Sequence, residues 1–327
     1  MSAHLRSVVE SIIWGRNRDR VRAVWRIVTP LLVALATFVT TFVAAVAMGV
    51  PTGTTALISW LVTTLVVLIV IQITARFLDH RPVSEYGFRL SRGWWVDLTA
   101  GVVFGSLIIV MTLVTAYLLG SVTLPEEGLR VGPVSPIWLV AFLIGFAGVA
   151  LWEEIVFRGV VMTNAFDGLT EWGSSRTVAI WVALIGSAGI FALVHVPGEV
   201  SEGNSPWLAA FWTFSLGSLL GVSYLLSGEL ALPMGLHLSI NYVSGNVFGI
   251  AGVAQLEGVP TLFVLESATS GIVAPMNGIP IIISNLLGIV LVAGWCYWRR
   301  GPLEFTLNDS QSKTYRGRKT PASTSGK

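Results

Sequence analysis

Eight long apolar runs, separated by short charged or Gly/Pro-rich connections, restrict this chain to a membrane fold. About 20 apolar residues is the length that a helix needs to cross the hydrocarbon core of a bilayer. The runs are continuous and do not alternate, which argues against a β-barrel. We therefore expect an all-α, polytopic membrane helix bundle with about eight transmembrane helices. The predicted spans are 27–50, 55–75, 98–119, 137–162, 177–196, 207–226, 230–250 and 280–298.

The basic residues predict how the chain is oriented. Six Lys and Arg precede the first span, four lie between the second and third spans, and seven follow the last span. All of these fall on one side of the membrane if the chain crosses eight times. The positive-inside rule then places both termini in the cytoplasm. We expect a multi-pass protein of a bacterial inner or plasma membrane.

Composition and charge exclude several classes of protein. Hydrophobic residues make up 54% of the chain and charged residues only 12%, unlike a soluble domain. The net charge of +2 reflects basic residues that anchor the chain beside anionic membrane lipid, so we expect no nucleic-acid partner. The single cysteine, Cys296, excludes a disulfide framework and is expected to be an inert buried thiol.

Two adjacent glutamates lie inside the fourth apolar run. An ionised carboxylate costs several kcal/mol in hydrocarbon, so a membrane helix rarely carries two without a use for them. Arg158 follows Glu154 by four residues, on the same helix face, and is expected to pair with it. Glu153 points about 100° away and has no such partner on its own helix. Glu153 is therefore the better candidate for a working general base.

Polar residues in two later spans complete a candidate site. His195 can share or orient a proton. His237 and Asn241 lie four residues apart on one helix face, and both can donate hydrogen bonds. Two convergent donors opposite an acid–histidine pair suit attack of water on a carbonyl with stabilisation of the oxyanion. All the ionisable residues that we place well inside a span lie between Glu153 and His237.

Simpler interpretations exist for each part of this set. A Glu–Arg pair in a membrane helix is more often a packing interaction, and a lone membrane histidine is as often structural as functional. Two other functions stay open. A proton-coupled transporter could use Glu153, Glu154 and His195 as a relay. A non-catalytic scaffold or immunity protein could keep the same residues for structure alone.

Three motifs in order resemble a known family. They are E-E-x-x-x-R (Glu153, Glu154, Arg158), F-x-x-x-H (Phe191, His195) and H-x-x-x-N (His237, Asn241). Together they resemble the motifs of the CPBP intramembrane proteases, which include type II CAAX prenyl endopeptidases and bacteriocin-processing or self-immunity (Abi) proteins. The resemblance covers roughly residues 137–249. It implies an intramembrane endopeptidase that acts on a membrane-anchored protein or peptide.

The resemblance also implies roles for individual residues. Glu153 and His195 would activate a water molecule, and His237 and Asn241 would stabilise the oxyanion. Glu154, Arg158 and Phe191 would support the site. The family is often labelled as metalloproteases, so the cofactor is either none or a divalent metal such as zinc. For a metal, the candidate ligands are Glu153, His195 and His237, since carboxylate and imidazole both bind zinc.

The apolar runs and charges, together with the resemblance over the core, predict five parts of the chain. Residues 1–26 are a basic cytoplasmic segment, and 27–136 hold the N-terminal transmembrane helices. Residues 137–249 form the CPBP-like catalytic core. Residues 250–299 hold an outer connection and the last span, and 300–327 are a disordered basic tail. Within the outer connection, 251–279 is expected to be either re-entrant or surface-lying.

The predicted spans raise one geometric difficulty. Straight antiparallel helices with these borders would leave His195 well above Glu153. Either the helices are tilted and staggered, or residues 172–183 form a separate interfacial helix. The mechanism requires His195 and Glu153 to approach within the length of a hydrogen bond or of one bridging water.

Overall fold

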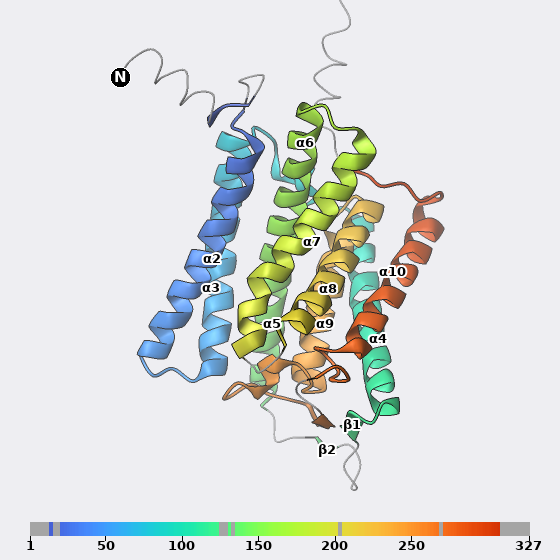
Figure 1. Cartoon of the computed structure of the whole chain (residues 1–327). Coiled ribbons are helices and arrows are strands. Elements are labelled where there is room, and N and C mark those ends of the chain that lie inside the picture. Colours follow the sequence, from blue (N-terminus) through green and yellow to red (C-terminus); the bar gives the residue numbers. More distant parts are fainter. Residues whose placement is uncertain are drawn as a thin grey trace, which may run out of the picture.

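The computed structural model of the chain describes residues 13–15, 20–123, 130–131, 135–201, 205–267 and 271–307. Over these residues the chain forms an all-α bundle whose helices run alternately up and down, as predicted (Figure 1). The helices are α2 (Ala23–Ala47), α3 (Thr52–Ile73), α4 (Arg92–Leu118), α5 (Pro136–Glu154), α6 (Thr163–Glu171), α7 (Arg176–Ser201), α8 (Pro206–Ser227), α9 (Ala231–Tyr242) and α10 (Ile279–Arg300). Most of the predicted tail 300–327 and part of segment 1–26 lie outside the described residues.

Seven helices of the described chain are long and apolar enough to cross a membrane. The predicted span 230–250 is the exception. It consists of α9 and a π-helical turn, η4 (Val243–Val247), which together are shorter than a full span. Its polar content is tolerated because α9 packs against α4, α5 and α8 and is buried along most of its length. The start of α2 and the end of α10 lie toward the same end of the bundle, here called the terminal end (Figure 1).

The borders of two predicted spans are wrong. The fourth span does not end at residue 162, because a π-helix, η3 (Ile155–Met162), joins α5 directly to α6 and makes one helix from Pro136 to Glu171. The fifth span runs on through Pro197 to Ser201. A separate interfacial helix over 172–183 is also wrong, since α7 is continuous from Arg176.

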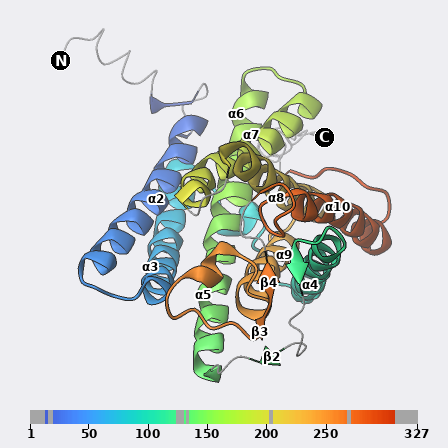
Figure 2. The same cartoon turned by 60° about the horizontal axis from the view of Figure 1, so that its bottom comes forward.

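The outer connection lies across the end of the bundle opposite the terminal end (Figure 2). It contains a 3-10 turn, η5 (Gly252–Gln255), and two short strands, β3 (Phe263–Val264) and β4 (Glu266–Ser267). These strands pair antiparallel with β2 (Arg130–Val131) and β1 (Val122–Thr123), respectively. Whether 251–279 is re-entrant or surface-lying stays a prediction.

Glycines set the close contact between α4 and α9. A Cβ at Gly101 would lie 2.4 Å from the Leu232 carbonyl oxygen, and one at Gly235 would lie 2.2 Å from the Leu98 carbonyl oxygen. Any side chain at either position would therefore force the two backbones apart, as expected for small residues at membrane helix contacts. This contact holds α9, and with it His237, against the rest of the bundle.

Buried ionisable residues also occur outside the stretch from Glu153 to His237, near the ends of helices. Asp97 is buried near the start of α4, and its carboxylate accepts a hydrogen bond from the Trp295 indole N–H at 2.9 Å. A second group gathers at the terminal end and links α2, the end of α3 and α6. It consists of Arg20, Arg26, Asp79, Arg81, Tyr86, Asp167 and Glu171. These residues lie at helix ends, just outside the spans drawn from hydropathy.

Candidate active site

The two glutamates stand where α5 widens into the π-helix η3. All eight residues of η3 are buried. A π-helical turn inserts an extra residue, and such turns occur frequently at functional sites. One contact to η3 comes from the neighbouring helix α7, where the Ser187 hydroxyl donates to the Phe157 carbonyl at 2.9 Å. The widened helix therefore packs directly against the helix that carries His195.

The length of the fourth helix brings His195 level with Glu153. Helices α6 and α7 form an antiparallel hairpin, with Glu171 and Arg176 on either side of its turn. At 1.5 Å per residue, Glu153 lies roughly 27 Å before that turn and His195 roughly 28 Å after it. The difficulty raised by the predicted borders is thus removed, because the fourth span was drawn nine residues too short.

Two histidines from two other helices converge on the Glu153 carboxylate. Its Oε2 atom lies 3.8 Å from His195 Nε2 and 3.8 Å from His237 Nε2. The predicted approach of His195 to Glu153 is confirmed. These distances exceed a direct hydrogen bond and suit a single bridging water. Glu153 Oε2 is buried and has no hydrogen-bond partner among the described residues.

His237 is held from its other side by Glu154. Its Nδ1 atom lies 2.7 Å from Glu154 Oε1, which also accepts from Arg158 Nη1 at 2.9 Å. A carboxylate paired with arginine only accepts, so Nδ1 of His237 carries the proton and donates. The Nε2 atom of His237 therefore faces Glu153 in a fixed orientation. Sequence spacing predicted the Glu154–Arg158 pair, but not the contact from Glu154 to His237.

His195 is oriented in a similar way by its own helix. Its Nδ1 lies 2.7 Å from the Phe191 carbonyl oxygen, which can only accept, so the Nε2 atom is directed at Glu153. The imidazole lies over the Phe191 ring, with centroids 4.3 Å apart. The His195 side chain is 33% exposed, whereas that of Glu153 is 8% exposed. His195 thus forms the accessible edge of an otherwise buried site.

The arginine is fully buried and bound on three sides. Besides Glu154, Arg158 donates through Nη2 to the Gly217 carbonyl at 3.1 Å, and its guanidinium lies 4.7 Å from the centroid of the Phe191 ring. Phe191 therefore contacts both Arg158 and His195, which gives a physical reason for an aromatic residue in the second motif. Gly217 lies on α8.

Asn241 lies one turn beyond His237 on α9, as predicted, and is half-buried. Its side chain makes no hydrogen bond to any other described residue. The amide is therefore available as a donor on the same helix as His237.

The candidate ligands do not form a metal centre in this geometry. Carboxylate and imidazole are suitable donors for zinc. However, the part of the chain that the structure describes contains no group of three His, Cys, Asp or Glu side chains arranged to hold a metal ion. The predicted metal ligands lie near one another, and we assign no step to a metal.

Comparison with known proteins identifies the central part of the chain. Residues 133–243 match the family model described as type II CAAX prenyl endopeptidase, Rce1-like. This part of the chain therefore resembles the CAAX-type proteases. The match includes every residue of the three motifs, and no curated protein or solved structure matches the chain significantly. With seven apolar helices in its described part, the chain is a multi-pass membrane protein, and its central part matches a peptidase family. The predicted domain borders remain predictions.

Proposed function

We propose that this protein is an intramembrane endopeptidase that hydrolyses peptide bonds of membrane-associated proteins or peptides. One observation carries the proposal. The buried Oε2 atom of Glu153, without a hydrogen-bond partner in the described chain, lies 3.8 Å from the Nε2 atoms of two histidines that are each fixed through Nδ1. This arrangement suits a water held between an acid and two imidazoles.

The proposed reaction begins with that water. Glu153 takes one of its protons as general base while the oxygen attacks the scissile carbonyl, with His195 sharing the proton. The attack breaks the carbonyl π-bond and forms a tetrahedral oxyanion. In the charged state His237 donates from Nε2 to this oxyanion, and Asn241 donates through its amide. The proton taken from water then passes to the leaving amine as the C–N bond breaks.

Glu154 and Arg158 act as positioning residues in this scheme. Positive charge on the His237 ring is stabilised by the Glu154 carboxylate at Nδ1, as a buried carboxylate stabilises imidazolium in other hydrolases. Arg158 offsets the cost of burying Glu154. No covalent acyl-enzyme is needed, because the nucleophile is water. We place the enzyme in the cell membrane of a bacterium, with its substrates anchored in the same bilayer.

The test is cleavage of a membrane-peptide library by the purified protein, with and without a chelator. Glu153→Gln keeps the size of the side chain and removes the base, so we expect a loss of at least 100-fold in kcat/KM. Glu257→Gln is the matched control, since Glu257 is exposed on the outer connection, and its activity should equal that of the unaltered protein.

The outcomes separate the competing functions. Cleavage lost in Glu153→Gln and kept in Glu257→Gln supports the proposal, and loss on adding chelator would show a metal requirement. Equal cleavage by all three proteins would overturn the assignment of Glu153. Proton-coupled flux through reconstituted protein, without cleavage of any library member, would instead favour a transporter.

A further inference from the structure

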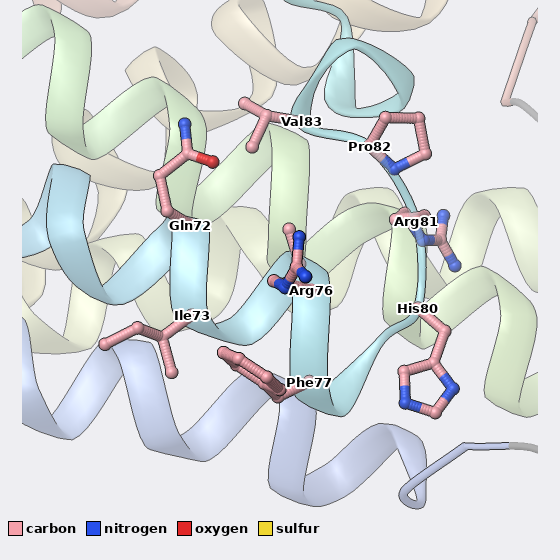
Figure 3. A pocket seen from close by; sticks show the side chains of 9 residues that line it. Gln72, Ile73, Arg76, Phe77, His80, Arg81, Pro82 and Val83 are labelled. Carbon is pink, nitrogen blue, oxygen red and sulfur yellow. The ribbon is translucent and has the colours of Figure 1, made fainter.

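A groove of about 600 Å³ lies at the end of α3, away from the active site (Figure 3). It is formed by the last turn of α3, the π-helical turn η1 (Thr74–Leu78) and the chain leading into the 3-10 turn η2 (Val83–Tyr86). No residue of the three motifs lines it. The proposed peptidase reaction therefore leaves this groove without a role.

The groove is basic on one side. Arg76 and Arg81 line it, and no carboxylate does. Arg76 is exposed, and within the described chain it forms no ion pair, only a contact with the Phe77 ring at 5.6 Å. Arg81 is buried and pairs with Asp79 and Asp167, yet its Nη1 atom has no hydrogen-bond partner among the described residues. An anion in the groove would meet the uncompensated charge of Arg76.

The other side of the groove is apolar and belongs to a membrane helix. Ile73 is 49% exposed and Phe77 is 59% exposed, on the last turns of a helix that qualifies as a span from Thr52 to Leu78. Figure 3 shows both side chains on the same side of Arg76. The groove thus combines cationic and apolar surfaces where α3 reaches the edge of its span.

The backbone at the rim adopts an uncommon conformation. His80 has φ of 51°, and it is the only non-glycine residue of the described chain with a positive φ. Such conformations are uncommon outside glycine, and strained residues cluster at functional sites. The turn at His80 directs Asp79 and Arg81 into the buried ionic group and leaves the imidazole at the groove (Figure 3).

We propose that this groove binds an anionic phospholipid of the surrounding bilayer. The phosphate would accept hydrogen bonds from Arg76, and the start of an acyl chain would contact Ile73 and Phe77. A bilayer phospholipid supplies both parts at this depth, and basic residues at the membrane surface favour anionic headgroups. A free phosphate would satisfy Arg76 and leave the apolar side exposed.

The test uses the purified full-length chain in detergent and native mass spectrometry to measure bound ligand. The probes are dioctanoyl phosphatidylglycerol, dioctanoyl phosphatidylcholine and glycerol phosphate. We expect phosphatidylglycerol to bind about tenfold more tightly than either of the others, because only it combines the anionic headgroup with apolar chains. Arg76→Gln should lower its affinity about tenfold. Phe77→Ala should lower it severalfold without changing the binding of glycerol phosphate.

Arg92→Gln is the matched control. It removes the same charge from an exposed arginine at the start of α4, outside the groove, and should leave phosphatidylglycerol binding unchanged. Equal loss in Arg76→Gln and Arg92→Gln would overturn the proposal in favour of a diffuse basic surface. Equal binding of the two lipids would exclude headgroup recognition. Tight binding of glycerol phosphate would identify a soluble-anion site instead. The comparison of probes on the unaltered protein decides these points even where a variant fails to fold.

Discussion

At the scale of single residues, the site depends on how one histidine is shared between two glutamates. His237 faces Glu154 through Nδ1 at 2.7 Å and Glu153 through Nε2 at 3.8 Å. The side chains of adjacent helical residues point about 100° apart. Glu153 and Glu154 can therefore reach opposite edges of the His237 imidazole only if this ring lies between them. The two carboxylates consequently differ in role. Oε1 of Glu154 is bound by both Arg158 and His237, whereas Glu153 faces the two histidine Nε2 atoms only at 3.8 Å, and the Oε2 atom of each glutamate has no hydrogen-bond partner within the described chain.

We expect Glu154→Gln to lower kcat by about 10–100-fold with little change in KM, because a neutral amide orients His237 less well and stabilises its charged form less. Its pH–rate profile should also shift relative to the unaltered enzyme. The measurement is kcat and KM across pH at a temperature where circular dichroism shows the variant folded. Activity that falls only in proportion to the folded fraction would contradict a positioning role and indicate a structural one.

At the scale of helices, two features place the site. The continuous helix from Pro136 to Glu171 makes the hairpin with α7 long enough to set His195 level with Glu153. The close packing of α4 and α9 at Gly101 and Gly235 sets the position of His237. Both features act through backbone geometry and involve no side chain of the site itself.

Gly235→Ala should therefore disturb the site from two residues away. Its Cβ would lie 2.2 Å from the Leu98 carbonyl oxygen, so α9 must move, at a cost of about 1–3 kcal/mol in the free energy of unfolding. We expect a lower melting temperature and reduced peptidase activity. Gly294→Ala on α10 is the control, because a Cβ there has no neighbour within 4 Å and should be neutral or slightly stabilising. The same response in both variants would show that the α4–α9 contact is not responsible.

At the scale of the whole molecule, the buried ionic group at the terminal end joins α2 and α3 to the catalytic core. Asp79 accepts from Arg26 and pairs with Arg81 at 2.8 Å, and Asp167 on α6 pairs with Arg81 and with Arg20. The Tyr86 hydroxyl donates to Asp79 at 2.7 Å. The group thus holds α2, the end of α3 and α6 together at the terminal end of the bundle. Helix α6 follows directly after η3.

Asp79 should make stability depend on pH. Burial alone would raise its pKa, but Arg81, Arg26 and the Tyr86 hydroxyl together hold the pKa of Asp79 below its ordinary value. A group with a lowered folded-state pKa stabilises the protein above its unfolded pKa of about 4, and this contribution is lost as pH falls through the folded-state value.

We expect Asp79→Asn to lower stability at pH 7 by about 3–5 kcal/mol, because it leaves buried arginines without their partner. Its melting temperature should also fall less than that of the unaltered protein as pH drops below about 4. Thermal unfolding in detergent from pH 7 to pH 3 measures both effects, with Glu257→Gln as an exposed control. Parallel pH curves for Asp79→Asn and the unaltered protein would assign the pH dependence to other groups.

The sequence by itself determined the class of the fold and the residues worth testing. Apolar runs of membrane length, and the few ionisable residues inside them, can be recognised without knowing the tertiary fold. The reason is that the bilayer penalises an unsatisfied polar group wherever it occurs along a span. This is why Glu153, His195 and His237 could be selected from sequence. The orientation of the termini follows from the same local charges and stays a prediction.

Only the tertiary structure decided how these residues meet. Hydropathy could not locate the end of the fourth helix, since residues 163–171 are too polar to count as membrane yet continue the same helix. The contact from Glu154 to His237 joins residues 83 positions apart, and the groove at Arg76 arises where η1 follows α3. Such contacts depend on the lengths of the helices, on the distances between helices that glycines allow, and on buried ion pairs. The periodicity of the sequence does not predict them.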